Sequence, residues 1–177
     1  MRELESKLSQ RIAAPDATAQ RPSILLIGIG NYLMGDEGIG VQFIQWLAEN
    51  NIQLPDTDIL DGGVGGFTLM GHFDAYDKVI FVDATMDQKP LGTVSLIKPR
   101  FSSDFPKGLT AHDFGLKDMV ESMYLLGRVP ELYLFTISIE EIQPMTVALS
   151  PEVENSIPML AKEIGQLIQQ LAIPKMV

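Results

Sequence analysis

The chain has 177 residues, 46% of them hydrophobic and 20% charged, and 13 Lys and Arg against 23 Asp and Glu give a formal net charge of −10. Such a surface repels nucleic-acid phosphates and anionic lipid headgroups, so we expect no nucleic-acid partner and no membrane association. The chain contains no cysteine, which excludes disulfides, thiolate catalysis and cysteine-ligated metal centres.

Residues 1–22 are polar and charged and lack the apolar stretch of a signal peptide. We expect them to form an N-terminal extension, either a tail or a short helix, outside the core. No apolar run reaches the length of about 18 residues that a membrane-spanning helix needs. The sequence therefore predicts a soluble, cytoplasmic protein with one domain over residues 23–177.

Strand and helix patterns alternate from residue 23 onward. Runs of aliphatic and β-branched residues that stop at Gly or Asp predict buried strands at 24–27, 58–60, 78–83 and 132–137. A period-2 pattern at 93–98 predicts an edge or hairpin strand. Helical spacing and end signals predict helices at 38–50, 66–73, 110–127 and 150–171. This order predicts the α/β class: a single three-layer α/β/α domain whose twisted, mostly parallel sheet has about five strands.

The functional site of such a sheet lies beyond the carboxyl ends of its strands. Residues 28–40 (GIGNYLMGDEGIG) follow the first predicted strand and open like a dinucleotide-binding motif. However, Leu33 replaces the third glycine, and Asp36 and Glu37 stand where a pyrophosphate needs backbone donors and no negative charge. A nucleotide-binding enzyme is therefore the less favoured alternative. The glycines instead indicate a close approach by another ligand, such as a polypeptide.

Acidic side chains end two of the predicted strands. Glu37 follows the first strand and Asp83 ends the central one, so both should lie at the same edge of the sheet. His112 follows a loop that could swing over this edge, and with it the two carboxylates form an incomplete ligand set for Zn, Ni, Fe or Co. Structural roles are the alternative: a helix-start carboxylate, a loop-bonding aspartate and a solvated histidine. Asp61, before two glycines, fits a simple turn, and His72 fits a structural or exposed position.

Residues 28–40 closely resemble the signature of nickel–iron hydrogenase maturation endopeptidases. Four further segments are similar to that family, in matching order: Asp61-Gly62-Gly63, Val82-Asp83-Ala84, Thr110-Ala111-His112-Asp113 and Leu149-Ser150-Pro151-Glu152-Val153. The resemblance extends from about residue 23 to residue 172 and implies an α/β fold.

The resemblance also implies an activity, which is removal of a short C-terminal extension from the precursor of the hydrogenase large subunit after nickel insertion. It implies that Glu37, Asp83 and His112 form the metal-binding site and take part in catalysis, with Asp61 at a further matching acidic position. The nickel would come with the substrate, and zinc or cadmium could replace it in a crystal. The implied partner is the large-subunit precursor, and we expect a monomer.

The mechanism stays open at two points. With no cysteine and no serine in a G-x-S-x-G turn, water is the expected attacking species, activated by a metal that also polarises the scissile carbonyl. An aspartic-type attack through Asp36, Asp61 or Asp83 is the alternative. A different class of function is a non-catalytic, metal-dependent binding module of hydrogenase assembly. Glycines at 62–66 and the loop at 99–109 are the candidate contacts for the substrate.

Overall fold

In the computed structural model, five strands form one sheet in the order β2-β1-β3-β5-β4. The structure describes residues 22–64, 69–73, 75–100, 104, 113–125, 127 and 129–172. The strands are β1 (Ile24–Ile29), β2 (Thr57–Gly63), β3 (Lys78–Thr85), β4 (Val94–Ile97) and β5 (Glu131–Ser138). Four of them are parallel, and β4 runs antiparallel to β5 at one edge. The predicted α/β class and its mostly parallel sheet are confirmed.

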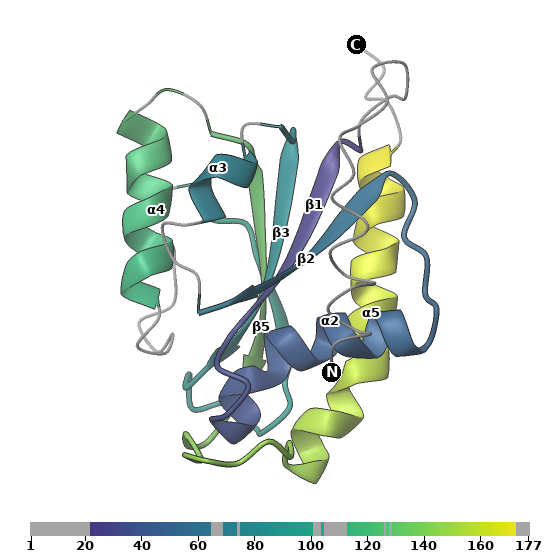
Figure 1. Cartoon of the computed structure of the whole chain (residues 1–177), viewed down its shortest axis with the longest axis vertical. Coiled ribbons are helices and arrows are strands. Elements are labelled where there is room, and N and C mark those ends of the chain that lie inside the picture. The colour runs from purple at the N-terminus through teal and green to yellow at the C-terminus, as the bar shows by residue number, and fades with distance from the viewer. Residues whose placement is uncertain are drawn as a thin grey trace, which may run out of the picture.

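Helices cover both faces of this sheet (Figure 1). Helices α2 (Ile39–Glu49) and α5 (Pro151–Ala172) pack on one face, and α3 (Met70–Phe73) and α4 (Asp113–Leu125) pack on the other. A short 3-10 helix, η1 (Gly35–Gly38), leads into α2. The predicted N-terminal extension and the start of the helix expected at Thr110 lie outside the described residues. No helix in the described segments is long and apolar enough to cross a membrane.

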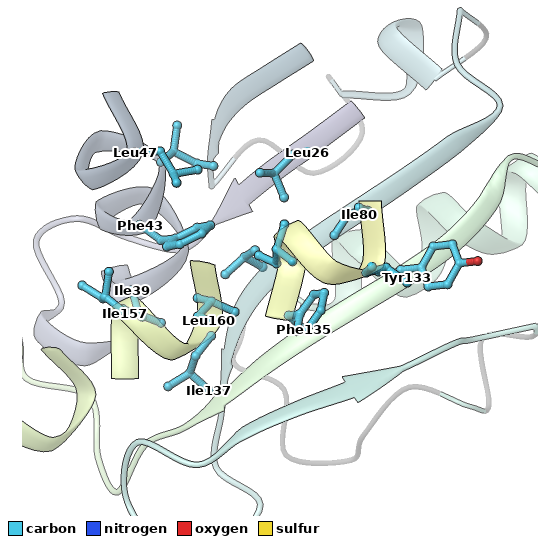
Figure 2. Packing of buried hydrophobic residues seen from close by; sticks show 14 of the residues in the cluster. Leu26, Ile39, Phe43, Leu47, Ile80, Tyr133, Phe135, Ile137, Ile157 and Leu160 are labelled. Carbon is cyan, nitrogen blue, oxygen red and sulfur yellow. The ribbon is translucent and has the colours of Figure 1, made fainter. Parts of the chain in front are cut away.

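Among the residues that the structure describes, the α2–α5 face holds the larger group of buried side chains. Leu26 and Ile80 from the sheet pack with Phe43 of α2 and Leu160 of α5, and all four are fully buried (Figure 2). The hydroxyl end of Tyr133 points away from this group. Strands β1, β3 and β5 are buried along almost their whole length because both of their faces are covered.

The α3–α4 face is lined by the alternate residues of the same strands. Ile27 and Phe81 pack there with Leu116 and Val120 of α4. The rings of Phe73 and Phe81 meet edge to face, with centroids 5.9 Å apart. Because successive side chains of a strand point to opposite faces, these contacts also fix the direction of the residues that follow at the carboxyl ends.

Candidate active site

Glycines bring α2 and η1 against the carboxyl ends of β1 and β3. A Cβ atom on Gly40 would lie 2.3 Å from the carbonyl oxygen of Val82, and one on Gly28 would lie 2.1 Å from the carbonyl oxygen of Gly40. Gly30, with φ of 138°, would bring a Cβ to 2.0 Å from the carbonyl oxygen of Glu37. The interpretation of these glycines as an approach site for an external polypeptide is therefore wrong. The space beside them is filled by the chain's own backbone.

The two neighbouring acids of η1 are both buried. Asp36 is 1% exposed and Glu37 is 2% exposed. The backbone N–H of Glu37 donates to the carbonyl of Met34 at 3.4 Å. Since η1 contacts β3 and the Glu37 backbone lies against Gly30, the 3-10 helix holds Glu37 just beyond the end of β1.

Asp36 connects η1 to the segment before α5. Its Oδ1 accepts the backbone N–H of Ser150 at 2.6 Å, and its Oδ2 accepts a hydrogen bond from Nε2 of Gln143 at 3.1 Å. The backbone N–H of Asp36 donates in turn to Oε1 of Gln143 at 2.9 Å. Sequence reasoning missed Gln143, which carries no motif. Both carboxylate oxygens of Asp36 are thus used in holding the local structure.

Helix α5 begins at Pro151, one residue after the predicted start, and Ser150 does not cap it through its side chain. The Ser150 hydroxyl is buried and makes no hydrogen bond within the described structure. Its carbonyl accepts the N–H of Glu154 at 2.9 Å, which is the first bond of the helix. The negative charge of Asp36, bonded at Ser150, lies at the end of α5 where the helix dipole favours an anion.

Asp83 lies in β3, two residues after Phe81, so its side chain points to the α3–α4 face. The residue is 1% exposed, and its Oδ1 accepts the N–H of Ala84 at 2.8 Å. Gly28 of β1 is paired with Val82, the residue before Asp83. Glu37, on η1 beyond the end of β1, and Asp83, near the end of β3, therefore lie at the carboxyl ends of two adjacent parallel strands.

Asp61 lies near the end of β2, which pairs with β1 on the side away from β3. It follows Ile59, which packs on the α2–α5 face, so alternation directs Asp61 to the face opposite that of Asp83. Its side chain is exposed, and its Oδ1 accepts the N–H of Gly63 at 3.0 Å. Partial desolvation raises the pKa of the Asp61 carboxyl above its ordinary value of 3.8, and the bond from Gly63 opposes this rise.

The structure describes one of the two histidines, His72. His72 lies on α3 and is exposed, in line with its expected structural or exposed position. His112 lies outside the described residues, although α4, which begins at the next position, packs on the face to which Asp83 points. Within the described segments, no group of three His, Cys, Asp or Glu residues is arranged to hold a metal ion. The predicted ligand set of Glu37, Asp83 and His112 includes His112, which lies outside those segments.

Comparison with known proteins identifies the family. The profile of the hydrogenase maturation protease family (HycI) matches residues 41–167. The hydrogenase 2 maturation protease of Escherichia coli (strain K12) is 34% identical over 138 residues, which cover 76% of this chain and 83% of that protein. The chain belongs to the hydrogenase maturation protease family. The expected peptidase activity is thereby confirmed, and the two alternatives, a non-catalytic binding module and a nucleotide-binding enzyme, are disfavoured.

Solved structures of maturation proteases share this fold. The hydrogenase maturating endopeptidase HybD from E. coli has a TM-score of 0.74 and 28% identity, over 84% of this chain and 93% of that one. The [NiFe] hydrogenase maturation protease HybD from Thermococcus kodakarensis has a TM-score of 0.65 and 25% identity, over 85% of this chain and 99% of that one. The resemblance noted in residues 28–40 therefore extends to the architecture.

In this maturation protease, a second polar group lies at the ends of β3 and β5. Ser138 Oγ donates to Oδ1 of Asp87 at 2.7 Å, and Lys89 Nζ lies 2.8 Å from Oδ2 of the same carboxylate. Burial tends to raise the pKa of Asp87, but the hydrogen bonds from Lys89 and Ser138 together lower it below 3.8. A cavity of about 400 Å³ lies beside this loop and is lined by Met86, Gln88, Lys89, Leu91, Ile139 and Glu140. The predicted acids Glu37 and Asp83 do not line it.

Proposed function

We propose that this peptidase removes a C-terminal extension from the precursor of a nickel–iron hydrogenase large subunit, after nickel has been inserted. In this proposal Glu37, Asp83 and His112 recognise the nickel that the precursor carries. The observation that supports it is the position of two buried carboxylates, Glu37 and Asp83, at the ends of adjacent parallel strands. The name of the Thermococcus kodakarensis structure, a [NiFe] hydrogenase maturation protease, favours this class of substrate.

The donor set suits a transition metal that arrives with its own ligands. Carboxylate oxygens and an imidazole nitrogen are ligands that nickel accepts, and the same set accepts zinc. Glu37 and Asp83 are almost fully buried, and the attraction between an anion and a cation is stronger there than at the surface. Three protein ligands leave coordination positions open, which fits transient engagement of a metal that stays in the product.

The proposed chemistry is hydrolysis by water, because the chain offers no cysteine nucleophile. Glu37, Asp83 and His112 would hold the nickel that the precursor carries, and a metal there would polarise the scissile carbonyl or acidify a water molecule. Water loses a proton as its oxygen adds to the scissile carbonyl carbon, the C–N bond then breaks, and the departing amine takes up a proton. Asp61 is the candidate for moving that proton, because it lies at the end of β2, which is paired with β1, and partial desolvation raises the pKa of its carboxyl.

The test is the mass of the nickel-loaded precursor before and after incubation with the enzyme. We expect wild-type protein to release a peptide, and E37Q, D83N and H112A to leave the precursor intact. E49Q and H72A, which change an exposed glutamate and an exposed histidine, serve as matched controls and should cleave normally. Circular dichroism separates lost activity from lost folding. Full processing by all three site variants would remove these residues from the mechanism.

A second arm tests the metal. Precursor prepared without nickel should stay uncut by the wild-type enzyme. Efficient cleavage of this metal-free precursor would contradict recognition through nickel.

We also propose that residues 23–177 form the peptidase domain and act as a cytoplasmic monomer. A variant that begins at Ser23 should therefore cleave the precursor as the full chain does.

A further inference from the structure

Two loops lie side by side at the edge that carries Glu37. Residues 31–35 and 143–148, here called the paired loops, are joined by backbone hydrogen bonds. Thr146 donates to the carbonyl of Leu33 at 3.1 Å and accepts from the N–H of Gly35 at 2.7 Å. Gln143 donates to the carbonyl of Met34 at 3.3 Å, and Met34 and Thr146 form a parallel β-bridge. The peptide groups at this junction are therefore already bonded within the chain.

The paired loops present large apolar side chains to solvent. Tyr32 is 39% exposed, Leu33 50%, Met145 86% and Val147 42%, and we call these four residues the apolar patch. Met145 also has a φ of 60°, in the left-handed region that non-glycine residues rarely adopt. Other exposed apolar residues, such as Met159 on α5, lie outside the paired loops. A cluster of exposed apolar side chains on an acidic chain is typical of a surface that binds protein.

The apolar patch is connected directly to the candidate site. Gln143 bonds to Asp36 through both the oxygen and the nitrogen of its side-chain amide, and the N–H of Glu37 donates to the carbonyl of Met34. The loop that carries Leu33 thus continues into the residue proposed to meet the nickel. The apolar patch therefore lies on the same loops that bond to Asp36 and lead into Glu37.

We propose that the apolar patch docks an apolar segment of the large-subunit precursor beside its scissile bond. This inference rests on the proposed function and names the surface that holds the substrate. The occupant follows from the shown activity, since a peptidase has to bind a polypeptide around the bond that it cuts. Four side chains are too few for a stable dimer interface, which takes about 20–30 residues on each side. They suffice to anchor a short apolar segment whose specificity comes from a few side-chain contacts.

The test compares the double variant L33D/M145D with the control M159D, which places the same charge on α5. Processing of the nickel-loaded precursor is measured as a function of precursor concentration. We expect the double variant to raise KM at least about tenfold, with a much smaller effect on kcat, because desolvating a charge opposes docking. M159D should match the wild type. Thermal unfolding of each variant checks the fold, and the single variant M145D, at the most exposed position, serves if the double variant is unstable.

The outcomes separate the two proposals. An unchanged KM in folded L33D/M145D, alongside normal wild-type processing, overturns the docking surface and leaves the proposed function standing. A wild-type enzyme that does not cut the nickel-loaded precursor overturns the proposed function, and the docking surface with it. A change in oligomeric state on size-exclusion chromatography, with KM unchanged, would assign the apolar patch to a second copy of the chain instead.

Discussion

Asp36 and Ser150 are 114 positions apart in the sequence, yet Oδ1 of Asp36 accepts the backbone N–H of Ser150 at 2.6 Å. The same carboxylate is bonded by Gln143, so one buried side chain joins η1, the loop after β5 and the start of α5. Glu37 is the next residue along the chain. The position of the proposed nickel-recognising carboxylate therefore depends on an acid that is itself occupied in hydrogen bonds.

Replacing Asp36 tests this dependence. D36A removes two hydrogen bonds to a charged group, so we expect the free energy of unfolding to fall by about 2–3 kcal/mol in urea titrations. D36N keeps an acceptor oxygen for the Ser150 N–H and should lose less. Processing should fall in D36A and recover in part in D36N, which a loss of folding alone would not produce at temperatures where both variants are folded.

The partner residue supplies the control for Asp36. Q143A should destabilise less than D36A, because the Ser150 bond remains. The double variant D36A/Q143A should be less destabilised than the sum of the two single variants, with a coupling of about 0.5–3 kcal/mol. Strict additivity would mean that the two side chains do not act together.

Because α2 contacts the strand ends through Gly40, replacing Gly40 or Gly165 by alanine should change the stability in opposite directions. G40A places a Cβ 2.2 Å from the carbonyl oxygen of Ile29 and 2.3 Å from that of Val82, and backbone has to move to relieve it. We expect a loss of about 3 kcal/mol or more in stability. Gly165 lies within α5 with open space around a built Cβ, so G165A should gain about 0.5–1 kcal/mol. Equal melting temperatures for the two variants would contradict the packing described.

The strands could be predicted because each one carries its pattern locally. The continuous apolar run at 78–83 becomes β3, and the alternating run at 93–98 becomes the antiparallel edge strand β4. The edge position of Glu37 and Asp83 then follows from a general rule for parallel sheets. The type of each element could therefore be predicted from the sequence. The exact end of an element could not, because the extension of β3 to Thr85, for example, depends on its pairing with β5.

The contacts between distant segments could not be predicted. Gln143 is a single amide in a loop, and its bond to Asp36 spans 107 positions that no local pattern relates. A glycine in a sequence signals a close approach, but not which atoms approach it. At Gly28 and Gly40 the approaching atoms belong to the chain itself. These features depend on the path of the whole chain, which only the folded structure specifies.

Asp87 predicts a pH dependence of stability with a defined sign. Its folded-state pKa is lowered below 3.8, where the hydrogen bonds from Lys89 and Ser138 outweigh the opposing effect of burial. The stabilisation that the ionised Asp87 carboxylate gives the fold is therefore fully present above pH 3.8, the ordinary pKa of this group. It is lost as the pH falls through the lower pKa of the folded state. K89M should raise the pKa of the Asp87 carboxyl in NMR titrations and flatten this part of the pH profile of thermal unfolding.

A matched control for K89M is K162M, which removes an exposed lysine on α5. K162M should leave the pKa of Asp87 unchanged. If both variants shift the titration of Asp87 equally, the effect comes from net charge and not from the contact of Lys89 with Asp87, whose atoms lie 2.8 Å apart.

Asp61 and Asp83 point to opposite faces of the sheet, so the roles proposed for them, in proton transfer and in metal recognition, can be tested separately. If Asp61 moves a proton, D61N should lower kcat by about 10²–10⁴-fold, the range that general acid–base groups supply. Nickel-dependent binding of the uncleaved precursor should stay as in the wild type, whereas D83N should weaken it. The kcat–pH profile should also lose the limb that reports the raised pKa of Asp61. Wild-type rates in D61N would instead limit this residue to the turn in which it accepts the N–H of Gly63.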